Sequence, residues 1–192
     1  LIEASCSLKP LQKPHPPMWI GANADAAIRR TAEIADTWII PPHNRTDTIV
    51  RQMDVYKRAL DGAGKPFPKT LPLAREMFIA ENREEAMRLA QPYLEVKYKA
   101  YHAWGQDKAM PTGDDDLGQD YDELVQDRFL LGGVEEVAEQ LIEFTRATGA
   151  TDLVCPIQWP GMPQSHVLEQ MHMLTERVMP LVEEGLEKRR NI

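Results

Sequence analysis

The chain has 192 residues, 43% of them hydrophobic and 27% charged, and its 30 acidic against 22 basic side chains give a formal net charge of −8 at pH 7. This composition is typical of a globular protein and excludes a collagen-like or disordered chain. The acidic balance argues against nucleic acid as a partner, because phosphate neutralisation needs a basic patch. A membrane location is not expected either, because no apolar run reaches the roughly 20 residues that cross a bilayer.

The two cysteines and the first residue of the sequence indicate the protein's environment and the extent of the chain. Cys6 and Cys155 are too few and too far apart for a secreted disulfide scaffold. We therefore expect a reducing, cytoplasmic environment. The chain opens at Leu1 rather than at Met, so we expect it to be a piece of a longer protein.

The first third of the chain alternates short apolar runs with helical periodicity. Residues 1–17 are rich in proline and predict an extended lead-in. Residues 18–21 and 37–40 are apolar runs typical of strands buried on both faces. The apolar spacing predicts one helix over 24–35 and another over 49–60.

The middle of the chain continues this alternation. Residues 71–80 predict a third strand, and Asn82 with Glu85 forms a capping-box start for a long helix. Residues 104–127 then form a long polar, glycine-containing stretch, which predicts a lid or an insertion loop.

The last third predicts a helix over 134–145, a fourth strand over 151–155 and a final helix from about residue 164, kinked at Pro180. Four strands separated by helices indicate the α/β fold class, with a parallel sheet built by right-handed crossovers. We find no repeat and treat residues 1–192 as a single partial domain.

Common catalytic and metal-binding motifs are absent from the sequence. The turn after residue 20 has one glycine rather than the three of a dinucleotide fingerprint, and Gly62-Ala63-Gly64-Lys65 is followed by Pro66 rather than by a magnesium-binding hydroxyl. The acidic run 112–123 lacks the sixth-position glycine of a calcium loop. The five histidines show no metal-binding spacing, so we expect no metal, and the catalytic residues stay unassigned.

Position in the fold indicates the candidate site, because ligands of parallel α/β folds bind at the carboxyl ends of strands. The residues at those ends are Gly21, Ala22, Asn23 and Ala24; His43 and Asn44; Glu81 and Asn82; Gln158 and Trp159. The first group is the best anion cradle, because small residues expose backbone N–H groups at a helix N-terminus. An ordinary helix start capped by Asn23 is the alternative.

Two further residues have open roles. Arg75 lies inside an apolar strand, so it either pairs with a carboxylate, which we favour, or reaches an anionic ligand. Trp159 either stacks on a planar cofactor or packs at the rim of the fold.

Three segments resemble the luciferase-like flavin-dependent monooxygenases, the family of bacterial luciferase and of the F420-dependent oxidoreductases. They are KPLQKPHPPMWIGANADAAIRRTAEIADTWII at 9–40, LPLAREMFIAENREEAMRLAQPYL at 71–94 and FLLGGVEEVAEQLIEFTRATGATDLVC at 129–155. The resemblance implies a TIM-like (β/α)8 barrel, of which this chain would be the C-terminal half, strands five to eight. The stretch 104–127 matches the place of the family's mobile lid.

The resemblance also implies the chemistry: oxygenation of a small organic substrate by reduced FMN and O2, with a separate flavin reductase and a homo-oligomeric assembly. The implied cofactor-binding residues are Gly21, Ala22, Asn23, Ala24, Trp38, Gln158 and Trp159, while His43 and Arg75 bind substrate or support the structure. Asp25 would repel the flavin phosphate unless it points away or Arg29 compensates it. An F420-dependent reductase or dehydrogenase is the first alternative, and a non-catalytic half-barrel that binds a ligand or another chain is the second.

Overall fold

The computed structural model describes residues 7–187, so Cys6 lies outside the described part of the chain. Short strands alternate with longer helices, as the sequence predicts. The strands are β1 (Trp19–Gly21), β2 (Thr37–Ile39), β3 (Pro72–Ala74), β4 (Met77–Ile79), β5 (Leu130–Gly132) and β6 (Asp152–Val154). The α-helices are α1 (Asp25–Ile34), α2 (Thr46–Gly62), α3 (Arg83–Ala103), α4 (Tyr121–Leu124), α5 (Val134–Thr148), α6 (Gln164–His172) and α7 (Met179–Glu187).

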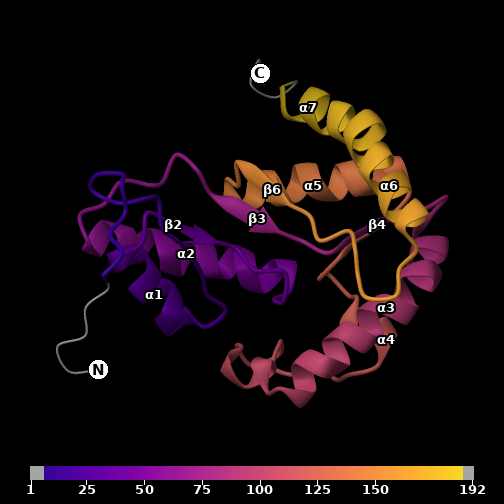
Figure 1. Ribbon diagram of the computed structural model, residues 1–192, viewed down its shortest axis with the longest axis horizontal. Coiled ribbons are helices and arrows are strands. Elements are labelled where there is room, and N and C mark those ends of the chain that lie inside the picture. Colours follow the sequence, from indigo (N-terminus) through magenta and orange to yellow (C-terminus); the bar gives the residue numbers. More distant parts are fainter. Residues whose placement is uncertain (1–6, 188–192) are drawn as a thin grey trace.

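Every strand pair is parallel: β1 with β2, β3 with β6 and β4 with β5. A bridge between Ile40 and Leu73 joins the first pair to the second. The Ala74 N–H donates to Ile40, whereas the Arg75 N–H donates to Val154, so β2 and β6 lie on opposite edges of the same strand. That strand, β3 with β4, runs through the middle of the molecule (Figure 1).

The predicted third strand is interrupted at Arg75 and Glu76, which separate β3 from β4. The segment that follows β6 contributes to this interruption. Arg75 donates its backbone N–H to Val154, but the next residue able to return a bond would be Pro156, which has no N–H. The Met77 N–H still donates to the Pro156 carbonyl at 3.5 Å, but Pro156 returns no bond, so the regular ladder with β6 stops at β3. β4 pairs with β5 along the other edge, the one that β2 occupies beside β3.

The strand β5 was not predicted, because its three residues are too short to show a periodicity. Its pairing with β4 places Leu131 opposite Phe78. The prediction that the first strand is buried on both faces is wrong: 47% of Trp19 is exposed, because β1 pairs with β2 alone among the described residues. The last strand, β6, is also partly exposed to solvent, with 39% of Val154 exposed.

Helices pack on both faces of the central strand. On one face, Leu73 joins a core with side chains of α1 and α2, while Met77 joins a core with side chains of α5 and α7. On the other face, Phe78 packs with α3 and with the chain before β5. Each large side chain that is fully buried, such as Trp38, contributes about 1.5–3 kcal/mol to folding.

The stretch 104–127 contains a 3₁₀ turn (Gln106–Ala109) and the short helix α4. Its apolar side chains Met110, Leu117, Leu124 and Val125 are buried in the core that α3 forms. The stretch is therefore packed against the protein in this conformation, and its role as a lid stays a prediction.

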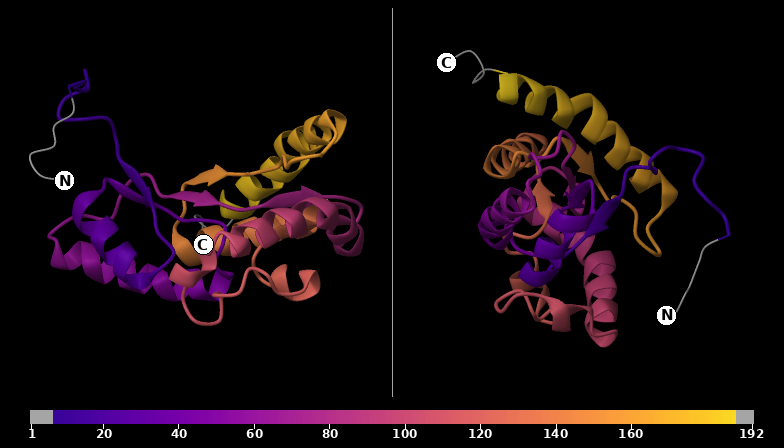
Figure 2. Two further views of the ribbon diagram at one scale, coloured as in Figure 1. Left: turned by 60° about the horizontal axis from the view of Figure 1, so that its bottom comes forward. Right: turned by 90° about the vertical axis from the view of Figure 1, so that its left-hand side faces the viewer.

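The C-terminal helix changes to π-helical hydrogen bonding over Met173–Val178, just before Pro180. Such a turn accommodates the missing N–H of a proline. Figure 2 shows α6 and α7 as one continuous rod beside α5. Within residues 7–187, no helix combines the length and the hydropathy that a bilayer span requires.

Candidate functional site

The turn that joins β1 to α1 is held by side chains from the next strand–helix unit. The carbonyl of Asn23 accepts hydrogen bonds from Asn44 Nδ2 at 3.1 Å and from Gln52 Nε2 at 2.6 Å. Gln52 also accepts a bond from Asn44 at 2.9 Å. The residues predicted at the ends of the first two strands are thus brought together, with Gln52 as a member that the sequence did not reveal.

The N-terminus of α1 has no side-chain cap. Ala24, not Asn23, is the N-cap residue, and the first intrahelical bond runs from Ile28 N–H to Ala24 O. The alternative of a helix start capped by Asn23 is therefore wrong. The N–H groups of the first helical turn stay available to an anion, as a phosphate cradle requires.

The charge of Asp25, at the start of α1, is compensated from α2. Arg51 donates to both carboxylate oxygens at 2.7 and 2.9 Å, and Gln52 adds a bond at 3.1 Å. The hydrogen bond from Arg51 is the main reason that the pKa of Asp25 is lowered. Arg29, which the sequence analysis offered as the compensating cation, contributes less than Arg51. The two charges reduce the repulsion that this carboxylate would exert on a phosphate.

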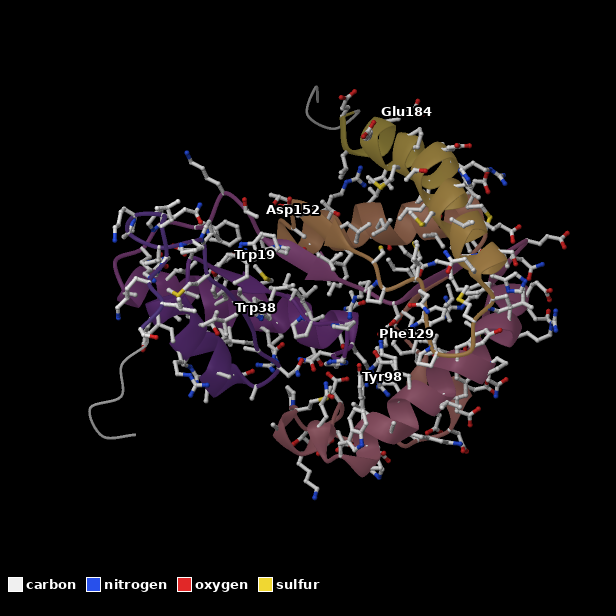
Figure 3. The ribbon with its side chains drawn as sticks, in the orientation of Figure 1. Trp19, Trp38, Tyr98, Phe129, Asp152 and Glu184 are labelled. Carbon is white, nitrogen blue, oxygen red and sulfur yellow. The ribbon has the colours of Figure 1, made fainter. Side chains whose placement is uncertain are left out.

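Trp38, labelled in Figure 3, is fully buried. Its ring lies against Tyr56 of α2. Its indole N–H donates to the carbonyl of Ala22 at 3.0 Å. Trp38 therefore fixes the backbone of the predicted phosphate turn. Gly21 stays exposed at the end of β1, beside the buried Ala22.

His43 is buried in the loop after β2, with 9% of its surface exposed. The Gln106 amide donates to its Nε2 at 2.7 Å, and its Nδ1 has no partner. Burial, with smaller contributions from Lys97, Arg128 and Arg75, lowers the pKa of His43 to about 4. The imidazole is therefore neutral at pH 7.

Trp159, after β6, is buried and stacks between Phe78 and Tyr93. Its indole N–H donates to Glu76 Oε2 at 2.8 Å. This placement supports the rim-packing alternative of the sequence analysis. Gln158 is exposed next to it.

Glu76 is a site residue that the sequence analysis did not select. It is fully buried, and its Oε1 accepts a bond from Lys97 Nζ at 2.5 Å. Tyr98, which packs against Phe129 in Figure 3, has its hydroxyl 3.4 Å from the same oxygen. The signal was available, because two adjacent charges interrupt an otherwise apolar strand at Arg75 and Glu76.

A cavity of about 350 Å³ adjoins this group, between α3 and the loop after β6. Four of its nine lining residues are aromatic, and Lys97 is the one charged residue among those of 7–187 that line it. The lining residues are Tyr93, Val96, Lys97, Ala100, Tyr101, Trp104, Gln158, Trp159 and Pro160. Its aromatic lining suits a planar organic molecule.

The 104–127 stretch is anchored to the loop after β2 by a buried ion pair. Arg128 Nη2 lies 3.0 Å from Asp114 Oδ1, and both side chains are fully buried. Arg128 also donates to the His43 carbonyl at 2.6 Å. Asp114 accepts the Arg45 N–H at 3.2 Å, so the contact joins the stretch to the site.

Arg75 does not form the carboxylate pair that the sequence favours. Its Nη1 donates to the carbonyl of Asn44 at 2.9 Å, and its guanidinium lies 4.6 Å from the centroid of Phe144. Within residues 7–187, no carboxylate lies within ion-pair distance of Arg75, so that prediction is wrong. Glu81 and Asn82 are exposed, and Asn82 caps α3, accepting the N–H of Glu85 at 3.0 Å.

One histidine has two carboxylates beside it, although the sequence showed no metal-binding spacing. His102 Nδ1 lies 2.5 Å from Asp107 Oδ2 and 3.6 Å from Asp116 Oδ1. Burial raises the pKa of Asp107, but the hydrogen bonds from the Leu117 N–H and His102 outweigh it and leave the pKa lowered. The bonds to Asp107 hold the 3₁₀ turn to the chain before α4.

Known proteins similar to this chain share its fold. A sequence model described as luciferase-like monooxygenase matches residues 3–152. No curated protein sequence matches the chain. Among solved structures, the oxygenating constituent of 3,6-diketocamphane monooxygenase from Pseudomonas putida, in complex with FMN, is 19% identical with a TM-score of 0.63; the match covers 88% of this chain and 49% of that one.

Two other solved structures show the same likeness. Monooxygenase RslO1 from Streptomyces bottropensis is 17% identical with a TM-score of 0.60, covering 88% of this chain and 49% of that one. An F420-dependent secondary alcohol dehydrogenase, in complex with an F420-acetone adduct, is 10% identical with a TM-score of 0.64, covering 88% and 50%. The chain thus spans about half the length of these three structures.

Proposed function

The chain belongs to the luciferase-like monooxygenase family, and from this premise we propose that it is the C-terminal half, strands five to eight, of a (β/α)8 barrel that oxidises a small organic substrate with reduced FMN and O2. The parallel strands and the exposed β1 and β6 support this proposal, because a barrel would continue from these two edges. A full barrel of this kind needs about 250 residues.

The observation that carries the flavin assignment is the uncapped N-terminus of α1. The free N–H groups of its first turn, the small side chains of Ala22 and Ala24, and the compensation of Asp25 by Arg51 together fit a phosphate group. Asn44 and Gln52 hold the turn through the Asn23 carbonyl, so the cradle is organised before ligand binds. Trp38 supports it from behind through Ala22.

The aromatic cavity supplies the second half of the proposed site. Trp159 and Gln158 line it from the loop after β6, and its aromatic rings offer apolar surface to a planar ligand. Lys97 presents a cation there, with Glu76 fixing its position. We assign substrate or ring contact to this cavity, and a covering role to residues 104–127.

Bound FMN, once reduced, would supply the electrons for the reaction with O2, and the protein would bind, orient and shield it. We further propose that a separate reductase provides the reduced flavin and that the enzyme is a homo-oligomer. F420 is the second candidate cofactor, because its side chain also carries a phosphate and the fold resembles that of an F420-dependent dehydrogenase.

The test compares three ligands by fluorescence titration of the full chain: FMN, riboflavin and F420. Riboflavin lacks only the phosphate, so we expect FMN to bind about tenfold more tightly or better, given several charge-assisted hydrogen bonds. Equal affinities for FMN and riboflavin would refute the phosphate site at α1. Tighter binding of F420 than of FMN would replace the monooxygenase proposal with hydride transfer.

A further inference from the structure

A second cavity, of about 330 Å³, lies away from the aromatic one, between the N-terminus of α2, the helix α5 and the chain leading into β5. Three arginines line it: Arg75 from the break between β3 and β4, Arg83 from the start of α3, and Arg128. Apolar surface comes mainly from Phe129 and Phe144. Three cations from distant parts of the chain converge on one space.

Arg75 is 1% exposed, yet it has no carboxylate partner among residues 7–187. Its Nη1 is satisfied by the Asn44 carbonyl, whereas its Nη2 is buried and has no hydrogen-bond partner. Burial lowers the pKa of Arg75 to about 10, so the side chain still carries its charge at pH 7. Asp114 acts on this charge only from beyond ion-pair distance. A buried charge without a direct counter-ion is unfavourable, which favours the binding of an anion.

The neighbouring Arg128, by contrast, has a hydrogen-bond acceptor for each of its three side-chain nitrogens. Its Nε, Nη1 and Nη2 donate to the His43 carbonyl, the Leu124 carbonyl and the Asp114 carboxylate respectively. The protein therefore provides a counter-ion for one of two neighbouring buried arginines. Arg75 lines the cavity but has an acceptor only for Nη1 and none for Nη2.

Arg83 is half-buried and makes one long bond, 3.2 Å to the Leu131 carbonyl. Two carboxylates also line the cavity, those of Asp127 and Glu143, but both residues are exposed. In the described part of the chain, neither lies within ion-pair distance of the three arginines. Neither carboxylate therefore takes up the remaining N–H groups of Arg75 and Arg83.

We propose that this cavity binds a small oxyanion, a phosphate or carboxylate group, held by Arg75 and Arg83. Guanidinium groups bind such anions through charge-assisted, often paired hydrogen bonds. The cavity is larger than a phosphate, and the rings of Phe129 and Phe144 line the remaining space. The oxyanion can therefore be carried by a small organic molecule with an apolar body. This site is separate from the flavin phosphate turn at α1.

The experiment follows backbone amide NMR signals of the full chain during titration with inorganic phosphate. The amides of Phe129, Leu130 and Phe144 should shift, and Arg83→Gln should weaken that response about tenfold or more, through the loss of charge-assisted bonds. Arg88→Gln is the matched control, because Arg88 lies on the same helix but is exposed and pairs with Glu85. It should leave the response unchanged.

Arg83 is the primary variant because Arg75 also holds the Asn44 carbonyl, so its loss can unfold the chain. Shifts confined to residues 25–27 would place phosphate only at α1 and refute the proposal, as would equal responses of the wild type and Arg83→Gln. Phenyl phosphate is the second arm. Tighter binding than inorganic phosphate would identify an organic ligand, and equal binding a free anion.

Discussion

The indole N–H of Trp159 donates to the buried carboxylate of Glu76 at 2.8 Å, across 83 positions of sequence. This bond connects the loop after the last strand to the break in the central one. It also leaves the second oxygen of Glu76 to hold Lys97 at the aromatic cavity. The stability of the fold and the geometry of the proposed site therefore depend on the same carboxylate.

Glu76→Gln should lower the free energy of unfolding by about 1–3 kcal/mol, because it removes a buried charge-assisted bond and leaves Lys97 unpaired. Urea denaturation of Glu76→Gln, Lys97→Met and the double variant measures it. We expect the double variant to lose less than the sum of the two single losses. Additive losses would show that the two charges do not interact.

Arg51→Gln should weaken FMN binding several-fold, because Asp25 would then face the flavin phosphate without its main counter-charge. Fluorescence titration with FMN checks this. Arg58→Gln is the control, since Arg58 is exposed on the same helix and donates to the carbonyl of Asp54 rather than to Asp25. Riboflavin binding should be insensitive to both variants.

Acid should destabilise the fold through His43. Its pKa is about 4 in the fold, against 6.5 for a solvent-exposed imidazole, so the unfolded state binds more protons between these values. The stability that neutral His43 contributes is fully present above pH 6.5 and is lost as the pH falls towards 4. The whole loss in the free energy of unfolding is about 3 kcal/mol. In urea denaturation at a series of pH values, the free energy of unfolding of His43→Asn should depend less on pH than that of the wild type. His166→Gln, at an exposed histidine, should follow the wild type.

Asp114→Ala should detach the 104–127 stretch from the loop after β2. It removes the buried partner of Arg128, a change that costs about 3–5 kcal/mol when one member of a buried ion pair is left. Hydrogen exchange should show lost protection over residues 106–125 before the core opens. Asp115→Ala, at the exposed neighbour, is the control, and an equal loss in both variants would contradict the anchoring role.

The helices and most strands could be predicted because their signals are local. Apolar spacing, the Asn82 cap and the two glycines before α5 placed the elements within a few residues. The break at Arg75 and the strand β5 could not be predicted. Both depend on pairing: Pro156 ends one ladder, and Leu131 meets Phe78 from 53 positions away in the other.

The candidate site divides in the same way. The sequence by itself determined the α/β class, the family resemblance and the small-residue turn after the first strand, because these follow from composition, periodicity and residues adjacent in the chain. Only the tertiary structure decided that Arg51 compensates Asp25, that Glu76 holds Lys97 and Trp159, and that Arg75 forms no ion pair within residues 7–187. Charge compensation depends on distances of a few ångströms between side chains, and for residues far apart in the sequence only folding sets those distances.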